Sequence, residues 1–226
     1  NVVGNSHEAS SKTQVLLLEV GGLEKLRMFT DIFYQKAMAD PHNDKFIRSH
    51  SDPHGERFAT WIAEKVRKRD ELQICHYHRY AILTHEYQPS PQFGDRSLPW
   101  QENRRNRPNC PVNLGRAGVV DVHDRSTAHY AAWHSPKRET EKWGDHFNLQ
   151  DCRVWLRLHF WSLRESGLME SSPKFTQYYT KFIAHFVKVY ERQAPQFVRD
   201  SVRWSEKKEN TDAYLARGRT MPDVMV

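Results

Sequence analysis

The chain has 226 residues, of which 38% are hydrophobic and 12% are aromatic. This composition excludes an intrinsically disordered chain and suits one domain with a sizeable core and polar insertions. The 34 Lys and Arg residues against 28 Asp and Glu residues give a net charge of +6, but the basic residues are dispersed. The densest basic groups, at 65–69 and 104–107, do not interleave with stacking aromatic residues, so we expect solvated loops rather than a nucleic-acid groove.

The cysteine content and the hydropathy of the chain indicate the kind of cellular compartment in which it works. Three cysteines, Cys75, Cys110 and Cys152, cannot form a disulfide framework, which indicates a reducing intracellular environment. No apolar run approaches the roughly 20 residues that a membrane-spanning helix needs, so we expect a soluble protein. The chain begins with Asn1 rather than Met, as it would after removal of a transit peptide or after trimming. We therefore favour a mitochondrial or other organellar matrix over the cytoplasm.

The first part of the chain predicts two amphipathic helices behind a flexible leader. Residues 1–13 are rich in small polar residues and show no apolar period. From Gly22 to the stop at Asp40-Pro41, apolar residues recur at helical spacing. Ser51-Asp52-Pro53 then offers an N-cap and a first-turn proline for a second helix that runs to about Arg67. The apolar positions of the two helices are Leu23, Leu26, Phe29, Phe33 and Met38, and then Phe58, Trp61, Ile62 and Val66.

A long irregular stretch precedes the remaining helices. Between about 69 and 121 the helical pattern gives way to prolines, scattered histidines and charged clusters, which indicates an insertion. A short helix is expected to begin near 124–126 and to close at Ser135-Pro136. Asn148 or Asp151 caps a strong helix that ends at Gly167, and another helix follows from Ser171-Ser172-Pro173 to Ala194-Pro195. No segment reads as a convincing strand, so the sequence predicts an all-α fold.

The order of several motifs resembles the truncated haemoglobins, most closely their second group. The segment from Val15 to Gly22, together with Phe33-Tyr34, Asp40-Pro41 and Phe46, resembles the opening of that family, in which a Gly-Gly pair starts the B helix. Residues 54–62 are similar to the family's E helix, and residues 175–190 are similar to its H helix. Residues 151–157 are similar to its G helix and carry the group's characteristic tryptophan at Trp155.

The resemblance implies a globin-like helical sandwich of the two-over-two kind. It covers a domain at 14–195 with the insertion at about 69–121, leaving a flexible leader at 1–13 and a C-terminal extension at 196–226. We expect the extension to pack as a short helix and then to fray, with anchors at Phe197, Val202 and Trp204.

The resemblance also implies that haem b lies between the E and F helices, with its iron bound by a histidine. The polar side chains facing the gas ligand would be those of Tyr34, His54 and Trp155. Packing against haem would come from Phe46 and Phe58, and Trp61 would close the pocket. Judged from the residues alone, each of these aromatic residues also suits ordinary core packing, and His54 also suits an exposed position at a helix N-terminus.

The iron-binding histidine is less well defined. At the family's usual spacing before Trp155 the sequence has Lys142, so the spacing differs here. We favour His129 as the metal ligand, because it lies in an Ala-rich segment whose small neighbours permit close approach of haem. His134 and His146 stay open as alternatives, as does the absence of any ligating histidine.

The function implied by the resemblance is binding of O2, NO or CO, with nitric oxide dioxygenation or peroxidase-like reduction as further reactions. Three hydrogen-bond donors around the ligand favour slow release over transport. The alternative is a haem-free or vestigial globin-fold accessory subunit of a larger, organellar complex, with protein partners bound through the insertion and the tail. A zinc site in the cluster from Cys75 to His78 is a lesser alternative, because its spacing matches no usual paired arrangement.

Overall fold

The computed structural model describes residues 10–51, 53–66, 128–188 and 191–219. Throughout these ranges the regular structure is helical and includes no strand, which confirms the predicted all-α class. The chain divides into two compact units. The first comprises Asn1–Ile47, His54–Lys68 and His146–Val226, and the second comprises Arg48–Pro53 and Arg69–Asp145. The predicted insertion at 69–121 and zinc cluster at 75–78 lie outside the described residues.

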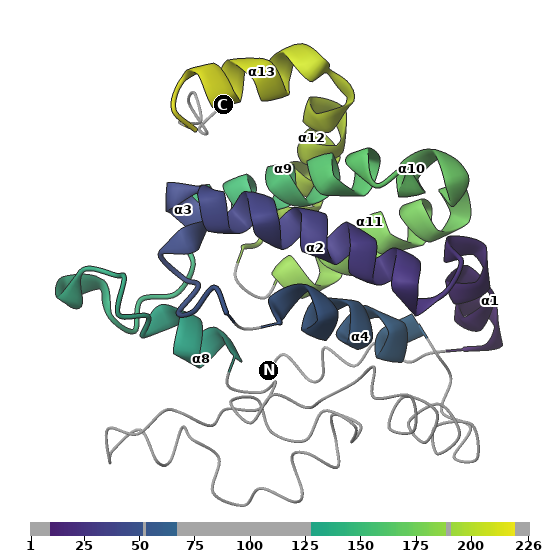
Figure 1. The fold of residues 1–226 in the computed structure, drawn as a ribbon, viewed down its shortest axis with the longest axis horizontal. Helices are drawn as coiled ribbons and strands as arrows, with labels where there is room; N and C mark the ends of the chain where they lie inside the picture. The colour runs from purple at the N-terminus through teal and green to yellow at the C-terminus, as the bar shows by residue number, and fades with distance from the viewer. Residues whose placement is uncertain (1–9, 52, 67–127, 189–190, 220–226) are drawn as a thin grey trace, which may run out of the picture. The chain divides into compact units, whose positions relative to one another are not determined.

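Four helices form the N-terminal part of the first unit (Figure 1): α1 (Ser11–Val20), α2 (Leu23–Ala39), α3 (Pro41–Asp44) and α4 (His54–Val66). A capping box between Ser10 and Thr13 starts α1, and Gly21 ends it in the left-handed region with φ of 88°. The Asp40 side chain accepts hydrogen bonds from the first amides of α3. Helices α2 and α4 confirm the two helices predicted from the apolar period. The sequence pattern predicted neither α3 nor α1, which begins at Ser11 within the expected leader.

Five helices form the C-terminal part of this unit: α9 (Leu149–Glu165), α10 (Leu168–Ser171), α11 (Pro173–Val187), α12 (Ala194–Glu206) and α13 (Lys208–Ala216). Both residues named as possible caps of α9 take part in its N-terminus. Asn148 accepts from the Asp151 amide, and Asp151 accepts from the Asn148 amide, which makes a reciprocal capping box. Pro173 occupies the first turn of α11, where its missing N–H costs nothing.

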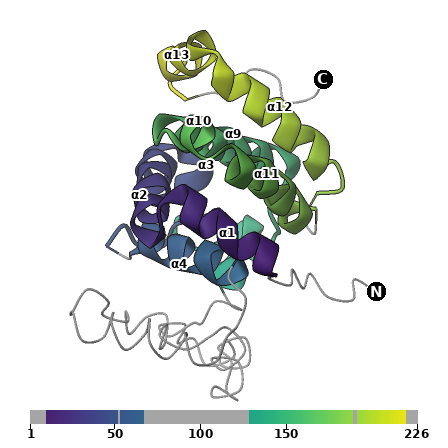
Figure 2. The ribbon, with the colours of Figure 1, turned by 90° about the vertical axis from the view of Figure 1, so that its right-hand side faces the viewer.

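The helices of the first unit pack in successive layers. Helix α2 lies against α4 and α9, and α12 lies against both α9 and α11. In Figure 2, α9 and α11 accordingly lie between α12 on one side and α2 and α4 on the other. One buried cluster joins residues of α1, α2, α4, α9, α11 and α12, and includes Leu26, Phe29, Ile62, Phe160 and Tyr179. The core therefore runs through the whole unit.

The C-terminal segment is more ordered than the sequence predicted. It forms two helices rather than one short helix that frays, and Tyr214 of α13 is buried with Phe33 and Leu158 in a second cluster. The expected anchors Phe197, Val202 and Trp204 all pack partly buried against the core clusters. Asp200 of α12 also receives ion pairs from the buried residues Arg153 and Arg157 of α9, at 3.3 and 3.2 Å. Helices α12 and α13 are thus integral to the first unit.

The described part of the second unit is short. It contains α8 (Ala128–Trp133), at the position of the predicted short helix, and a single 3-10 turn at Thr140–Lys142. The Arg138 guanidinium holds the segment after α8 by donating to the carbonyls of Trp133 and Asp145, at 2.7 and 2.9 Å. These contacts close residues 133–145 into a compact loop.

Candidate functional site

The first feature of the site is a contact between a tyrosine of α2 and a histidine of α4. The rings of Tyr34 and His54 stack with centroids 5.1 Å apart and planes inclined by 23°. Both side chains are half-buried. The two residues that the sequence analysis assigned to different helices therefore lie together, and each side chain combines a ring with a polar group.

A close approach of the two helices brings these rings together. Gly55 follows His54 directly, and a Cβ at this position would overlap the Asp31 carboxylate and lie 3.1 Å from the Asp31 Cα atom. The Thr30 hydroxyl donates to the Gly55 carbonyl at 2.7 Å and fixes the same crossing from α2. The small residue at position 55 is therefore what permits the register in which His54 lies over Tyr34.

Aromatic side chains extend the surface beside this pair. Phe58, one turn after His54, lies edge-on to Tyr34 at 6.3 Å and stacks on Trp61 at 5.7 Å. Trp61 in turn contacts Phe182 and Phe186 of α11 at 5.2 and 5.0 Å. Phe58 and Trp61 are half-buried, so the surface combines apolar rings with two polar neighbours.

Trp155 of α9 belongs to the same group. Its ring lies 5.6 Å from Phe33 and 6.3 Å from Phe58, and the side chain is half-buried. The Trp155 ring also stacks on His159, with centroids 4.6 Å apart and planes inclined by only 14°. The structure thus brings five of the predicted residues into one set, which we name the α2–α4–α9 aromatic group: Tyr34, His54, Phe58, Trp61 and Trp155.

A histidine that the sequence analysis did not identify lies behind this group. His159 is fully buried, and its Nε2 atom is 2.7 Å from the hydroxyl of Tyr179 on α11. Burial lowers the pKa of His159 from 6.5 to about 3, and burial raises the pKa of Tyr179. The imidazole and the phenol are therefore both neutral over the physiological range. The one available signal was the spacing of four residues from Trp155, which places both on one face of α9.

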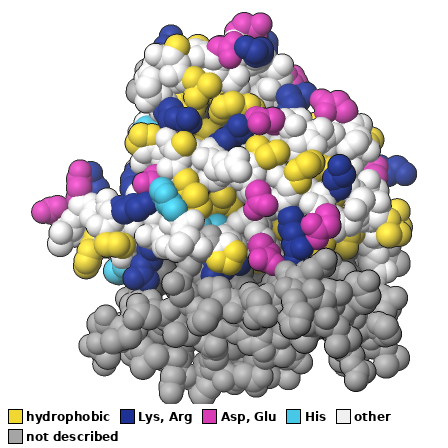
Figure 3. All heavy atoms as spheres, viewed as in Figure 1, with side chains coloured by type: hydrophobic (Ala, Val, Ile, Leu, Met, Phe, Trp, Pro, Cys, Tyr) yellow, Lys and Arg dark blue, Asp and Glu magenta, His cyan; other side chains and the backbone are white. Residues whose placement is uncertain are grey.

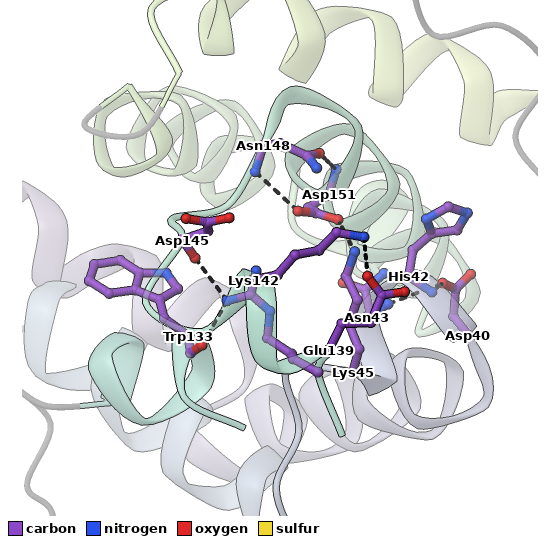
Figure 4. A network of polar contacts seen from close by, with 11 residues as sticks. Asp40, His42, Asn43, Lys45, Trp133, Glu139, Lys142, Asp145, Asn148 and Asp151 are labelled. Atoms are coloured by element: carbon purple, nitrogen blue, oxygen red, sulfur yellow. Dashed lines mark hydrogen bonds and ion pairs between the residues drawn. The ribbon is translucent and has the colours of Figure 1, made fainter. Parts of the chain in front are cut away.

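Phe46, predicted to pack against haem, is held by another set of residues. Its ring lies edge-on to Phe147 at 4.9 Å, and the Lys45 ammonium lies 4.9 Å from its centroid. Lys45 also forms an ion pair of 2.6 Å with Asp151, the capping residue of α9 (Figure 4). The charged and capping contacts therefore anchor the segment after α3 to the start of α9.

Of the three candidate iron ligands, two lie in the second unit. His129 is an exposed residue of α8, with its ring 6.2 Å from that of Trp133. His134 follows α8, and a Cβ at Gly144 would lie 3.5 Å from its Nε2 atom. The third, His146, is exposed and begins the last segment of the first unit. The structure defines the arrangement within each unit, so the expected position of His129 opposite Tyr34 and His54 stays a prediction.

Among the described residues, no group of three His, Cys, Asp or Glu side chains is suited to holding a metal ion. Burial raises the pKa of the Cys152 thiol to about 12, so this cysteine is protonated and a poor nucleophile. Figure 3 shows acidic and basic side chains intermingled on the described part of the face in view. Among the described helices, none has the length and apolar character needed to cross a membrane.

Comparisons with protein-family models, with curated proteins and with solved structures found no match to this chain. The interpretation of the site therefore depends on its own geometry and on the motifs in the sequence.

Proposed function

We propose that the chain is a haem-binding globin of the truncated, two-over-two kind that binds O2, NO or CO. The observation that carries this proposal is the stacking of Tyr34 on His54 beside the half-buried rings of Phe58 and Trp155. Hydrogen-bond donors set within an aromatic surface are what a small gas ligand on a flat, apolar cofactor requires. In this proposal α2 with α4, and α9 with α11, are the two helix pairs of the sandwich.

The residues present suit haem in their chemistry. Phe58, Trp61 and Trp155 are only half-buried, so they retain ring surface that a porphyrin would cover. His129 is our first choice for the iron ligand, with His134 and His146 as the alternatives. An imidazole in any of these positions binds iron in its neutral form. Bound haem supplies the iron centre at which the gas ligand binds.

The role of the protein is to hold that ligand. The Tyr34 hydroxyl and the Trp155 indole N–H are donors, and His54 is a donor in either neutral tautomer when the correct ring nitrogen is turned inward. A hydrogen bond formed in a water-poor surrounding is stronger than one in water. We therefore propose retention of the ligand for reaction, either nitric oxide dioxygenation or peroxide reduction, rather than rapid release for transport.

Oxygen dissociation from the reduced, haem-loaded chain tests this proposal. We expect Tyr34→Phe to accelerate dissociation by roughly tenfold, which corresponds to losing about 1.4 kcal/mol of hydrogen bonding. Tyr178→Phe on α11 is the matched control, because it also removes one hydroxyl from a half-buried tyrosine. We expect that control to keep the wild-type rate in stopped-flow measurements. Equal dissociation rates for the two variants would show that Tyr34 does not bond to the ligand and would contradict the proposal.

A further inference from the structure

The hydrogen-bonded pair of His159 and Tyr179 is buried in the core of the first unit. Both side chains are completely buried, and the atoms that join them, Nε2 and the phenolic oxygen, are 2.7 Å apart. Phe29 and Phe33 lie edge-on to the imidazole, each with centroids 5.0 Å away. The pair is thus surrounded by aromatic rings that exclude water from the hydrogen bond.

The direction of this hydrogen bond follows from the number of groups left without partners. Within the described part of the chain, the Nδ1 atom of His159 has no hydrogen-bond partner. If the Tyr179 hydroxyl donates to Nε2, only the Nδ1–H is left unpaired. If Nε2–H donates instead, the phenolic proton and the Nδ1 lone pair are both unpaired, which is the costlier arrangement. Tyr179 is therefore the donor, and His159 is poised to accept its proton.

Stability alone does not explain why a histidine occupies this position. A buried polar atom without a partner is destabilising, and two apolar side chains of similar shape would avoid that cost. Burial also lowers the pKa of His159 to about 3, so the imidazole carries no charge in the folded protein at neutral pH. What the pair provides is a phenol in direct contact with an unprotonated base.

A continuous stack of rings connects this pair to the α2–α4–α9 aromatic group. His159 stacks on Tyr179 with centroids 5.3 Å apart and planes inclined by 27°. The His159 ring also stacks on Trp155, with centroids 4.6 Å apart. Trp155 is half-buried, so the phenol, the imidazole and the indole form one path from the core to the candidate site. Phenol and indole are among the side chains that most readily lose one electron.

We propose that Tyr179, His159 and Trp155 form a one-electron relay that reduces an oxidant bound at the α2–α4–α9 aromatic group. One electron leaves Tyr179 and passes through Trp155 to the oxidant. In the same step the phenolic proton moves from the Tyr179 oxygen to Nε2 of His159. The products are a neutral phenoxyl radical, an imidazolium and the oxidant reduced by one electron. A soluble reductant of the ascorbate class then returns an electron to the phenoxyl oxygen, and the proton returns with it.

The oxidant must be a metal-centred one-electron acceptor stronger than a phenoxyl radical, the class that a peroxide-treated haem provides. The identity of this natural oxidant rests on the proposed function, whereas the relay itself does not. The full-length chain without haem is therefore a suitable sample, with photogenerated tris(bipyridine)ruthenium(III) as the oxidant. A failure of the relay is then distinguishable from a failure to bind haem.

Electron paramagnetic resonance and transient absorption after the flash test the relay. The chain has nine tyrosines, so the expected signature is a long-lived tyrosyl component that soluble reductants quench slowly, because Tyr179 is buried. We expect Tyr179→Phe to remove this component and Tyr178→Phe, its neighbour on α11, to retain it. Persistence of the component in Tyr179→Phe would overturn the proposal, as would its absence from the wild-type chain.

A second variant separates proton transfer from a merely structural role. His159→Gln keeps a hydrogen-bond acceptor but removes the base, so we expect the radical to form roughly tenfold more slowly. Formation in the wild-type chain should be slower in D2O than in H2O, and this isotope effect should vanish in His159→Gln. Circular dichroism verifies that each variant is folded. A wild-type rate unaffected by D2O, or an isotope effect that survives in His159→Gln, would rule out transfer to His159.

Discussion

At the scale of residues, the site combines polar groups that come from separate helices. The resemblance implied that Tyr34 and His54 face one ligand from two separate helices, and the structure places their rings in contact. Their partner Phe58 follows His54 by one helical turn and shares the same face. The helical period indicates that Phe58 shares a face with His54, whereas the pairing of Tyr34 with His54 across two helices was expected only from the family resemblance.

His159 could not be predicted in the same way. Its partner Tyr179 comes from another helix, and sequence spacing within α9 does not show which side chain of α11 faces it. A single histidine among apolar residues also has no distinctive pattern. The contact of Phe46 with Phe147 could not be predicted either, because it depends on how the segment after α3 meets the start of α9.

The choice among His129, His134 and His146 is tested by replacing each with alanine. We expect only His129→Ala to lose stoichiometric haem uptake, because it would remove the iron ligand, and we expect free imidazole to restore the spectrum of that variant. The other two replacements serve as controls of the same size. An unchanged absorption spectrum in His129→Ala, with loss in His134→Ala or His146→Ala, would show that the ligand assignment is wrong.

At the scale of elements, the crossing of α2 and α4 sets the geometry of the site. The helices themselves were predictable, because their apolar period and the stop of α2 at Asp40-Pro41 are local features of the sequence. Their register was not predictable. It depends on the absence of a side chain at Gly55 and on the hydrogen bond from Thr30 to the Gly55 carbonyl. The short helices α3 and α10, with four residues each, are too brief to show a period.

Replacing Gly55 with alanine tests this crossing. Alanine favours a helix over glycine by about 1 kcal/mol, but here its methyl group would force α2 and α4 apart at a cost of about 1–3 kcal/mol. We therefore expect Gly55→Ala to lower the free energy of unfolding, measured by denaturant titration. Adding Asp31→Ala should restore the stability lost to the overlap with the Asp31 carboxylate. It should leave the stability lost to the contact with the Asp31 backbone. A stabilised Gly55→Ala would mean that the helices do not approach as closely as described.

At the scale of the whole molecule, the C-terminal helices contribute more buried residues and ion pairs to the first unit than their sequence suggested. The tail is rich in charged residues, which conceals the buried positions Val198, Ser201 and Tyr214. Two arginines of α9 pair with Asp200, and the Arg157 guanidinium lies 5.3 Å from the Trp204 ring. These contacts join segments that are distant in sequence, and the helical period by itself cannot reveal them.

Acid unfolding tests the burial of His159 within this unit. The pKa of His159 is about 3 in the folded chain and lies below the ordinary value of 6.5. Between these two pH values the unfolded chain therefore binds a proton at His159 and the folded chain does not. Stability should therefore be unaffected by this group above pH 6.5 and should fall as the pH drops toward 3, by roughly a few kcal/mol. We expect His159→Gln to show a shallower acid limb in denaturant titrations.

The exposed residue His185 provides the control, and His185→Gln should retain the wild-type limb. An acid limb equally steep in wild type and His159→Gln would contradict the neutral, buried state of this histidine.

Haem uptake by the purified 226-residue chain is the most direct test of the globin assignment. Titration with haemin, followed by absorption spectroscopy, should reach its end point at one haem per chain and give a Soret band. After reduction, that band should shift on addition of CO. A chain that stays colourless, or that binds haemin without a defined end point and without response to CO, would contradict the globin assignment and favour a haem-free accessory subunit.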